Sequence, residues 1–194
     1  MARQYAAIKI AIWGDDDFTS LPLPSQWLYF HLVSHPTLSL VGIADWRPRK
    51  IVPKAHGLTL PEVMGAADEL AAHRYVILDE DTEEVLIRSF LRNDSTLKTP
   101  KMADGIIRAY AAIASRNLKS HVAREMRRVH GEHPEYTSFQ GGKLDQILER
   151  AAQFDVGIDD RIDVGIDVPF DVRDLDWIAD AATHTHTGTP NHEP

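Results

Sequence analysis

The chain has 194 residues, no cysteine and a formal net charge of -8. This length suffices for one good-sized domain or for a smaller domain with appendages. Without cysteine the chain forms neither a disulfide scaffold nor a thiolate metal site. No apolar run approaches the roughly 20 residues of a membrane span, and no signal-peptide core follows the first residues. We therefore expect an intracellular, cytoplasmic protein without membrane contacts.

Charge is distributed unevenly along the chain. Residues 1–130 contain 17 Lys and Arg against 15 Asp and Glu, whereas residues 131–194 contain 4 against 14. Within the first part, residues 95–130 contain eight basic and two acidic side chains, a net charge of +6. This pattern predicts a boundary near Gly131 and a basic middle segment.

The first elements are predicted before residue 57. Pro24 or Ser25 begins an aromatic-rich helix, and Pro36 ends it. The apolar run Leu38–Ala44 predicts a short strand, and Trp46–His56 predicts a second helical segment. Three consecutive acids, residues 15–17, precede these elements. We interpret them as turn or capping residues, because sequence neighbours in a loop rarely converge on one metal ion.

The clearest pattern runs from Thr59 to Arg92. Thr59 and Glu62 have the spacing of a capping box, and apolar residues then recur every three or four positions, which predicts a helix with one buried face. Two strands follow, Tyr75–Leu78 and Val85–Leu91, joined by an acidic turn. A helix, a short strand, a short helix, a longer helix and a hairpin, in this order, are typical of a winged helix-turn-helix.

Beyond the hairpin, Pro100 begins a predicted helix that breaks near Asn117 or Leu118 and continues to Val129, with a basic outer face. From Gly131 the sequence predicts a largely disordered acidic tail with a short helix over 143–153. The pentapeptide DVGID occurs twice in it, at 155–159 and 163–167. Two copies are too few for a solenoid, which needs about three stacked repeats.

The predicted fold class is therefore mainly α with a small antiparallel β-hairpin (α+β). A winged-helix domain spans residues 1–98, a basic helical extension spans 99–130, and the acidic tail spans 131–194.

No catalytic motif is present. The chain lacks a nucleophile elbow, a phosphate-binding glycine-rich loop and a cysteine nucleophile. His31 and His35 have a spacing that can bind zinc, but no glutamate stands beside them and no third ligand follows at a suitable distance. We expect a binding module, not an enzyme, with no cofactor and no metal.

Three stretches carry a resemblance to a known family: IAIWGDDDFTSLPLPSQWLYFHLVSHP, GIADWRPRK and DEDTEEVLIRSFLRNDSTLKTPKM. They resemble the N-terminal winged-helix region of phage replication-initiation proteins, the replisome organisers of actinobacterial phages, which are similar in architecture to DnaD-type primosome proteins. The resemblance covers residues 7–101, about half of the chain. It implies binding to an origin or to single-stranded DNA, and recruitment of a replicative helicase or its loader.

The predicted DNA-binding residues are the cations around the helix and the hairpin. They are Arg47, Arg49, Lys50, Lys54, Arg74, Arg88, Arg92, Lys98, Lys101, Arg108, Arg116, Lys119, Arg124, Arg127 and Arg128. We place the contacts on these residues because the nominal recognition helix has Glu62, Asp68 and Glu69 on its exposed side and the hairpin turn holds five acids, all of which oppose phosphate.

Other functions stay open. The same fold suits a transcriptional regulator, or a protein–protein module whose acidic helix faces a basic partner or a second copy of the chain. Trp13, Trp27 and Trp46 are core residues or interface anchors, and the core is the default interpretation for all three. In the acidic tail, Trp177 and Ile178 are apolar residues suited to docking on a partner such as the helicase or its loader.

Overall fold

The computed structural model describes Ala6 and residues 8–154. This part of the chain is mostly helical with one small three-stranded antiparallel sheet, which confirms the predicted α+β class. The DVGID repeat, Trp177 and Ile178 lie outside the described residues.

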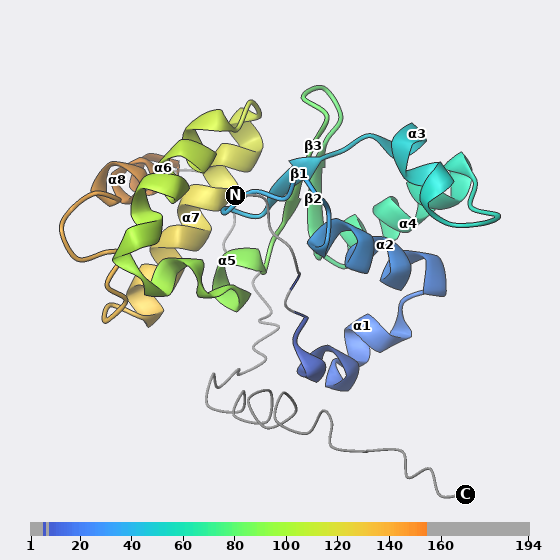
Figure 1. Cartoon of the computed structure of the whole chain (residues 1–194), viewed down its shortest axis with the longest axis horizontal. Coiled ribbons are helices and arrows are strands. Elements are labelled where there is room, and N and C mark those ends of the chain that lie inside the picture. Colours follow the sequence, from blue (N-terminus) through green and yellow to red (C-terminus); the bar gives the residue numbers. More distant parts are fainter. Residues whose placement is uncertain (1–5, 7, 155–194) are drawn as a thin grey trace, which may run out of the picture.

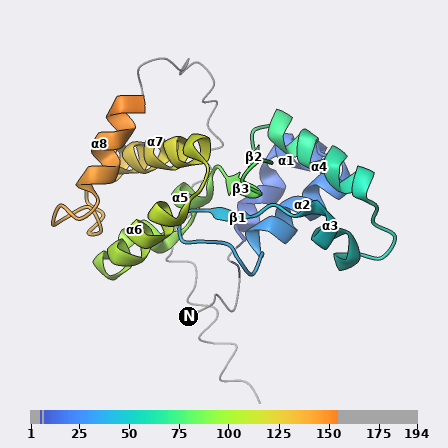
Figure 2. The same cartoon turned by 90° about the horizontal axis from the view of Figure 1, so that it is seen from above.

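The sheet separates two groups of helices (Figure 1, Figure 2). Its strands are β1 (Ile43–Asp45), β2 (Val76–Asp79) and β3 (Glu84–Ile87). On one side lie η1 (Ile10–Gly14), α1 (Asp16–Ser20), α2 (Leu23–Val33), α3 (Pro48–Ile51), η2 (Val52–Lys54) and α4 (Leu60–Ala72), where η denotes a 3-10 helix. The other side holds α5 (Phe90–Asn93), η3 (Ser95–Lys98), η4 (Pro100–Met102), α6 (Ala103–Ala112), α7 (Arg116–Glu132) and α8 (Asp145–Phe154).

Both faces of the sheet are buried. β3 is central and pairs antiparallel with β1 and β2, so the strand order is β1-β3-β2. Side chains of a strand alternate between the two faces. Val85 and Ile87 accordingly join the core of the first group of helices, while Leu86 between them joins the core of the second. The sheet thus belongs to two hydrophobic cores at once.

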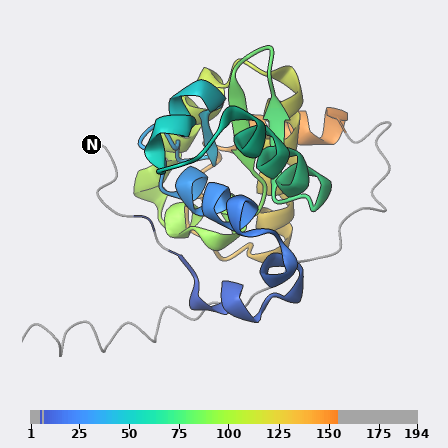
Figure 3. The ribbon, with the colours of Figure 1, turned by 90° about the vertical axis from the view of Figure 1, so that its right-hand side faces the viewer.

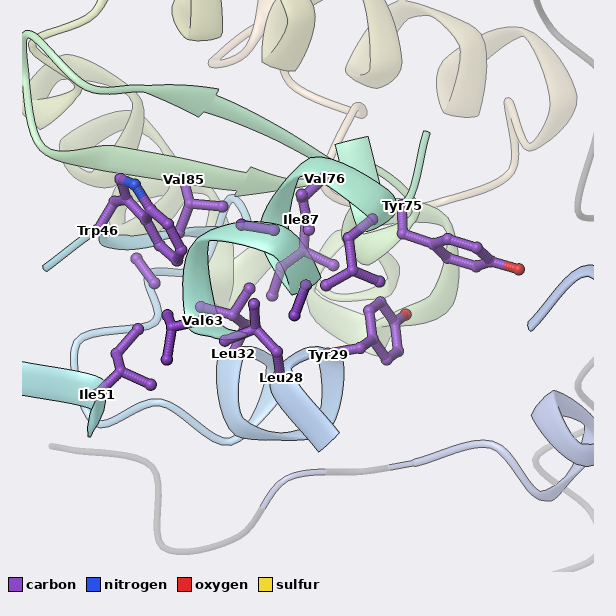
Figure 4. Packing of buried hydrophobic residues seen from close by; sticks show 14 of the residues in the cluster. Leu28, Tyr29, Leu32, Trp46, Ile51, Val63, Tyr75, Val76, Val85 and Ile87 are labelled. Carbon is purple, nitrogen blue, oxygen red and sulfur yellow. The ribbon is translucent and has the colours of Figure 1, made fainter. Parts of the chain in front are cut away.

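The first core lies between the sheet, α2 and α4 (Figure 4). Leu28 and Leu32 from α2 meet Val63 from α4 beneath the strands. Trp46 follows β1 and is 2% exposed, which confirms its interpretation as a core residue. Trp27 is half-buried, whereas Trp13 is 59% exposed, so the core interpretation is wrong for Trp13.

α4 begins with the capping box that the sequence predicts. The Thr59 side chain accepts from the backbone N–H of Glu62, and the Glu62 carboxylate accepts from the backbone N–H of Thr59 at 2.8 Å. These bonds to Thr59 lower the pKa of Glu62. Gly57, with φ of 78°, supplies the tight turn before the helix.

The second core lies between α6, α7, α8 and the other face of the sheet. Phe139, Leu144, Ile147 and Ala151 all belong to it. Residues 131–154 are therefore part of the folded chain, and the prediction of a largely disordered tail from Gly131 is wrong for them. The short helix predicted over 143–153 is confirmed as α8.

Two strand predictions were too long. β1 contains only Ile43–Asp45, because Ser39 Oγ accepts from the N–H of Val41 and Ile43 and holds the preceding residues in a turn. β3 ends at Ile87, and residues 90–93 form α5 instead of continuing the strand. The helical turn places Phe90 in the first core and Leu91 in the second.

The helix break predicted near Asn117 lies earlier, at residues 113–115. Ser115 accepts from the N–H of Leu118 at 3.0 Å and so caps α7. Pro100 begins a 3-10 turn, and the α-helix itself begins at Ala103.

The second core predicts a large effect for one buried leucine. Leu144 is 0% exposed, so Leu144→Ala should lower the free energy of unfolding by about 2–4 kcal/mol through lost burial and a residual cavity. Urea unfolding measures this value. Leu23 is 78% exposed, and the matched control Leu23→Ala should change it by less than about 0.5 kcal/mol. Equal effects of the two variants would contradict the packing of residues 139–151 in the second core.

Candidate nucleic-acid interface

The predicted DNA-binding cations lie in two separate places. Arg47, Arg49, Lys50 and Lys54 belong to α3, η2 and the residue before them. Most of the others follow the hairpin, on α5, η3, η4, α6 and α7. α3 and the α6–α7 layer lie at opposite ends of the molecule with the sheet between them (Figure 1, Figure 2). The cations therefore do not converge on a single surface.

The α3 end holds exposed cations on a fixed backbone. Pro48 begins α3, and Ile51, which is buried in the first core, anchors its end. Arg49, Lys50 and Lys54 are exposed, and within the part of the chain that the structure describes their side chains make no hydrogen bond or ion pair. We call these three residues the α3 cation cluster. It can meet an anion without breaking an existing pair.

Arg47 beside this cluster is already paired. Its Nε lies 2.9 Å from Glu83 Oε2 on the hairpin, and its Nη1 lies 3.9 Å from Asp45 Oδ2. The first pair links the residue before α3 to the acidic turn between β2 and β3. Both partners are exposed, so the pair contributes little to stability.

Arg92 and Arg124 make contacts inside the second group of helices and not on its outer surface. Arg92 forms an ion pair with Glu125 of α7, and both side chains are more than four-fifths buried. Arg124 Nη2 lies 3.3 Å from His121 Nδ1. Burial lowers the pKa of His121 to about 4, and Arg124 and Arg88 add to this effect. A neutral imidazole is therefore the partner of Arg124 at pH 7.

Several other predicted cations also have intramolecular contacts. Lys98 lies over the ring of Tyr136, and Lys119 over that of Tyr110. Arg128 pairs with Glu132 at 2.7 Å. Arg88 Nη1 donates to the carbonyl oxygen of Arg74, which has a φ of 63° at the end of α4.

At the α6–α7 end, three exposed cations remain without a hydrogen bond or ion pair among the described residues: Lys101, Arg108 and Arg116. Arg127 is also exposed and has contacts of its own.

Two acids of the hairpin have structural partners. Asp79 accepts from the hydroxyl of Ser115. Glu84 accepts from the backbone N–H groups of Ala114 at 3.0 Å and Ser115 at 2.8 Å. Two acids thus tie the hairpin to the loop between α6 and α7, a role that sequence reasoning missed. The sequence signal that could have located this loop is Ser115, a residue type that favours the position before a helix.

The exposed side of α4 stays acidic. Glu62 is held in the capping box, and Glu69 lies 3.4 Å from His73. Asp68 is exposed between them. Gly65 on this helix has open space around it. This face offers no cation to phosphate, as the sequence predicts.

Metal ligands do not gather in the part of the chain that the structure describes. No group of three or more His, Asp and Glu side chains there could hold an ion. His31 and His35 contact each other edge to face, and burial lowers both pKa values. Asp15 caps α1 by accepting from the N–H groups of Asp17 and Phe18, the capping role that the sequence suggests.

Comparison with known proteins gives no relative for this chain: no family model, no curated protein and no solved structure matches it. Among residues 6 and 8–154, every helix is too short or too polar to cross a bilayer.

The partly buried His121 predicts a pH-dependent stability. Its folded pKa of about 4 lies below the ordinary value near 6.5, so the unfolded chain binds the proton first as the pH falls. Stability should therefore fall between pH 6.5 and pH 4, by about 1 kcal/mol after allowance for the partial exposure of the ring. His121→Gln should flatten this part of the profile in urea titrations.

His31 and His35 should supply part of the remaining slope, because burial lowers their pKa values too. The exposed His56 provides the control: His56→Gln should leave the profile as in the wild type. An unchanged slope in His121→Gln would show that this imidazole does not titrate as described.

Proposed function

We propose that the chain is a winged helix-turn-helix protein that binds duplex DNA and catalyses no reaction. The strand order β1-β3-β2, with α2, α3 and α4 packed on one face of the sheet, agrees with this fold. The observation that carries DNA binding is the α3 cation cluster, three exposed cations that form no hydrogen bond or ion pair with other described residues and that directly precede α4.

The cluster favours contact with the backbone over reading of bases. Lysine and arginine on phosphate oxygens position a protein on DNA and supply affinity that depends on salt. Base readout needs polar side chains in the major groove, and α4 offers Glu62, Asp68 and Glu69 there. We therefore expect DNA binding with low sequence specificity.

A role in phage replication initiation is the biological setting we propose. Its support is the resemblance of residues 7–101 to replisome organisers of actinobacterial phages. In this role the chain would hold DNA at the α3 end and recruit the replicative helicase or its loader through the acidic residues after 154. The transcriptional regulator is the weaker alternative, because regulators of this fold usually dimerise to read palindromes.

A second candidate is a winged-helix module that binds protein and not DNA. The acidic exposed face of α4 is the observation that favours it, because Asp68 is exposed and forms no ion pair with another of the described residues. A basic partner would fit this face better than DNA would.

The α3 cation cluster gives the decisive test. The triple variant Arg49→Ala, Lys50→Ala, Lys54→Ala should weaken binding of the full chain to a duplex by about tenfold or more at low salt, and should lower the salt slope by up to about three, one for each lost phosphate contact. Fluorescence anisotropy across a salt series measures both quantities.

The matched control removes three exposed cations from the other end: Lys101→Ala, Arg108→Ala, Arg116→Ala. It should change affinity by no more than about twofold if the α3 end is the interface. Equal losses in the two triples would contradict that placement. No binding to any DNA at low salt would exclude the DNA function and leave the protein-binding module.

The acidic residues after 154 should reduce DNA affinity. Residues 155–194 contain two basic and ten acidic residues, a net charge of -8, and therefore compete with phosphate for the cations. Deleting these residues should strengthen binding at low salt, with the effect shrinking as salt rises. The deletion begins after α8, so the second core keeps Phe139, Leu144 and Ile147. Weaker binding after deletion would contradict this competition.

A further inference from the structure

The exposed apolar side chains of this protein gather at its start. Among the described residues, the large hydrophobic side chains that stay exposed are Ile8 (47%), Ile10 (82%), Trp13 (59%) and Leu23 (78%). All four precede the second turn of α2. Single exposed apolar residues are ordinary, but a group of them marks an interaction surface. We call this group the N-terminal apolar patch.

Ring contacts connect the parts of the patch. Trp13 lies with its ring centroid 6.2 Å from that of Phe18 and 5.7 Å from that of Phe30. Phe30 stands two turns after Leu23 on α2, so the two side chains share one face of that helix. Trp13 and Leu23 therefore border the same strip of α2.

The patch has a rigid base. Phe18 is 0% exposed and stacks edge to face on Tyr29 and Tyr75 in the first core. The inner side of the Trp13 ring rests on this cluster while more than half of its surface faces solvent. An aromatic side chain held in this way is a preorganised anchor for a partner, because little freedom is lost on binding.

Acidic residues stand beside the patch. Asp15, Asp16 and Asp17 directly follow η1. Asp15 is occupied as the cap of α1 and by the hydroxyl of Tyr75, whereas Asp16 and Asp17 are exposed and have no side-chain hydrogen bond among the described residues. The nearby Lys9 donates to Asn93 Oδ1 of α5 at 2.6 Å. The exposed charge next to the patch is therefore negative.

We propose that the N-terminal apolar patch binds a basic amphipathic helix of a partner protein. The apolar face of such a helix would cover Ile10, Trp13 and Leu23, and its lysines or arginines would meet Asp16 and Asp17. This proposal does not depend on DNA binding at α3.

Charge argues against the other occupants. Residues 155–194 of the same chain are acidic and would be repelled by Asp16 and Asp17. In a symmetric dimer the patch of one copy would contact the same patch of the other copy. Asp16 and Asp17 of one copy would then lie against Asp16 and Asp17 of the other. Duplex DNA would place phosphates against the same acids.

The position of the patch leaves the α3 end accessible. η1 and α1 lie at one edge of the molecule, and α3 and the hairpin tip lie at the opposite edge (Figure 1, Figure 3). A helix bound at the patch would not cover the α3 cation cluster. The protein could then hold two partners at once.

The test uses the full chain and a labelled peptide of about 18 residues, roughly five helical turns, with Leu and Lys in helical spacing. Anisotropy should report saturable binding to this peptide. A peptide of the same composition without an apolar face, and one with Glu in place of Lys, should each bind at least about tenfold more weakly.

Variants locate the binding surface. Ile10→Ser with Leu23→Ser should weaken binding by about tenfold or more, because both side chains would be covered by the partner. Asp16→Asn with Asp17→Asn should weaken it by about threefold and reduce its salt dependence. The matched control Glu80→Gln with Asp81→Asn, at the hairpin tip, should stay within about twofold of the wild type.

Three results would overturn the proposal. These are equal binding of the Glu peptide, binding that Ile10→Ser with Leu23→Ser leaves unchanged, and a dimer in sedimentation velocity that the same variant abolishes. The last result would assign the patch to a second copy of the chain. If the double variant folds poorly by circular dichroism, Leu23→Lys, at a side chain that is 78% exposed, replaces it.

Discussion

The small sheet is buried on both faces, and the rest of the structure depends on this double burial. In the central strand, Val85 and Ile87 enter one core while Leu86 enters the other. A shift of one residue in the pairing would exchange these faces and send every side chain of the strand to the wrong core. The register is therefore set from both sides, and the two groups of helices are held together by three short strands.

The acidic hairpin does not project freely into solvent along its whole length. Asp79 and Glu84 bind Ser115 and the backbone before α7, so the hairpin is tied to the second layer as well as to the first. Carboxylates that oppose DNA are thereby used to hold backbone N–H groups that would otherwise lack partners at the start of a helix. The packing before α7 therefore accounts for two of the five acids in this turn.

The sequence was most informative where the signal is local. The capping box of Thr59 and Glu62, the periodicity of α4 and the two hairpin strands each depend on residues close in the chain, and each is present. Long-range packing was harder to predict. Four widely spaced apolar residues bring 139–151 into the second core. Ten of the 14 acids in 131–194 lie after residue 154, so the composition of the whole segment suggested an unstructured tail. Likewise, nothing near Trp13 indicates that its ring covers Phe18 and Phe30 without being covered itself.

Long-range packing, which the sequence does not reveal, also decides how the basic residues should be interpreted. Arg92 and Arg124 add to the net charge in the same way as the α3 cation cluster does. However, Arg92 contacts Glu125 and Arg124 contacts His121 inside the second group of helices. Replacing Arg92 would leave the largely buried Glu125 carboxylate uncompensated, and any loss of binding would then be mixed with a loss of stability. Arg49, Lys50 and Lys54 stand on a backbone that Pro48 and the buried Ile51 hold in place. Their charge can be removed without disturbing the fold, so substitutions in this cluster separate a DNA-binding effect from a structural one.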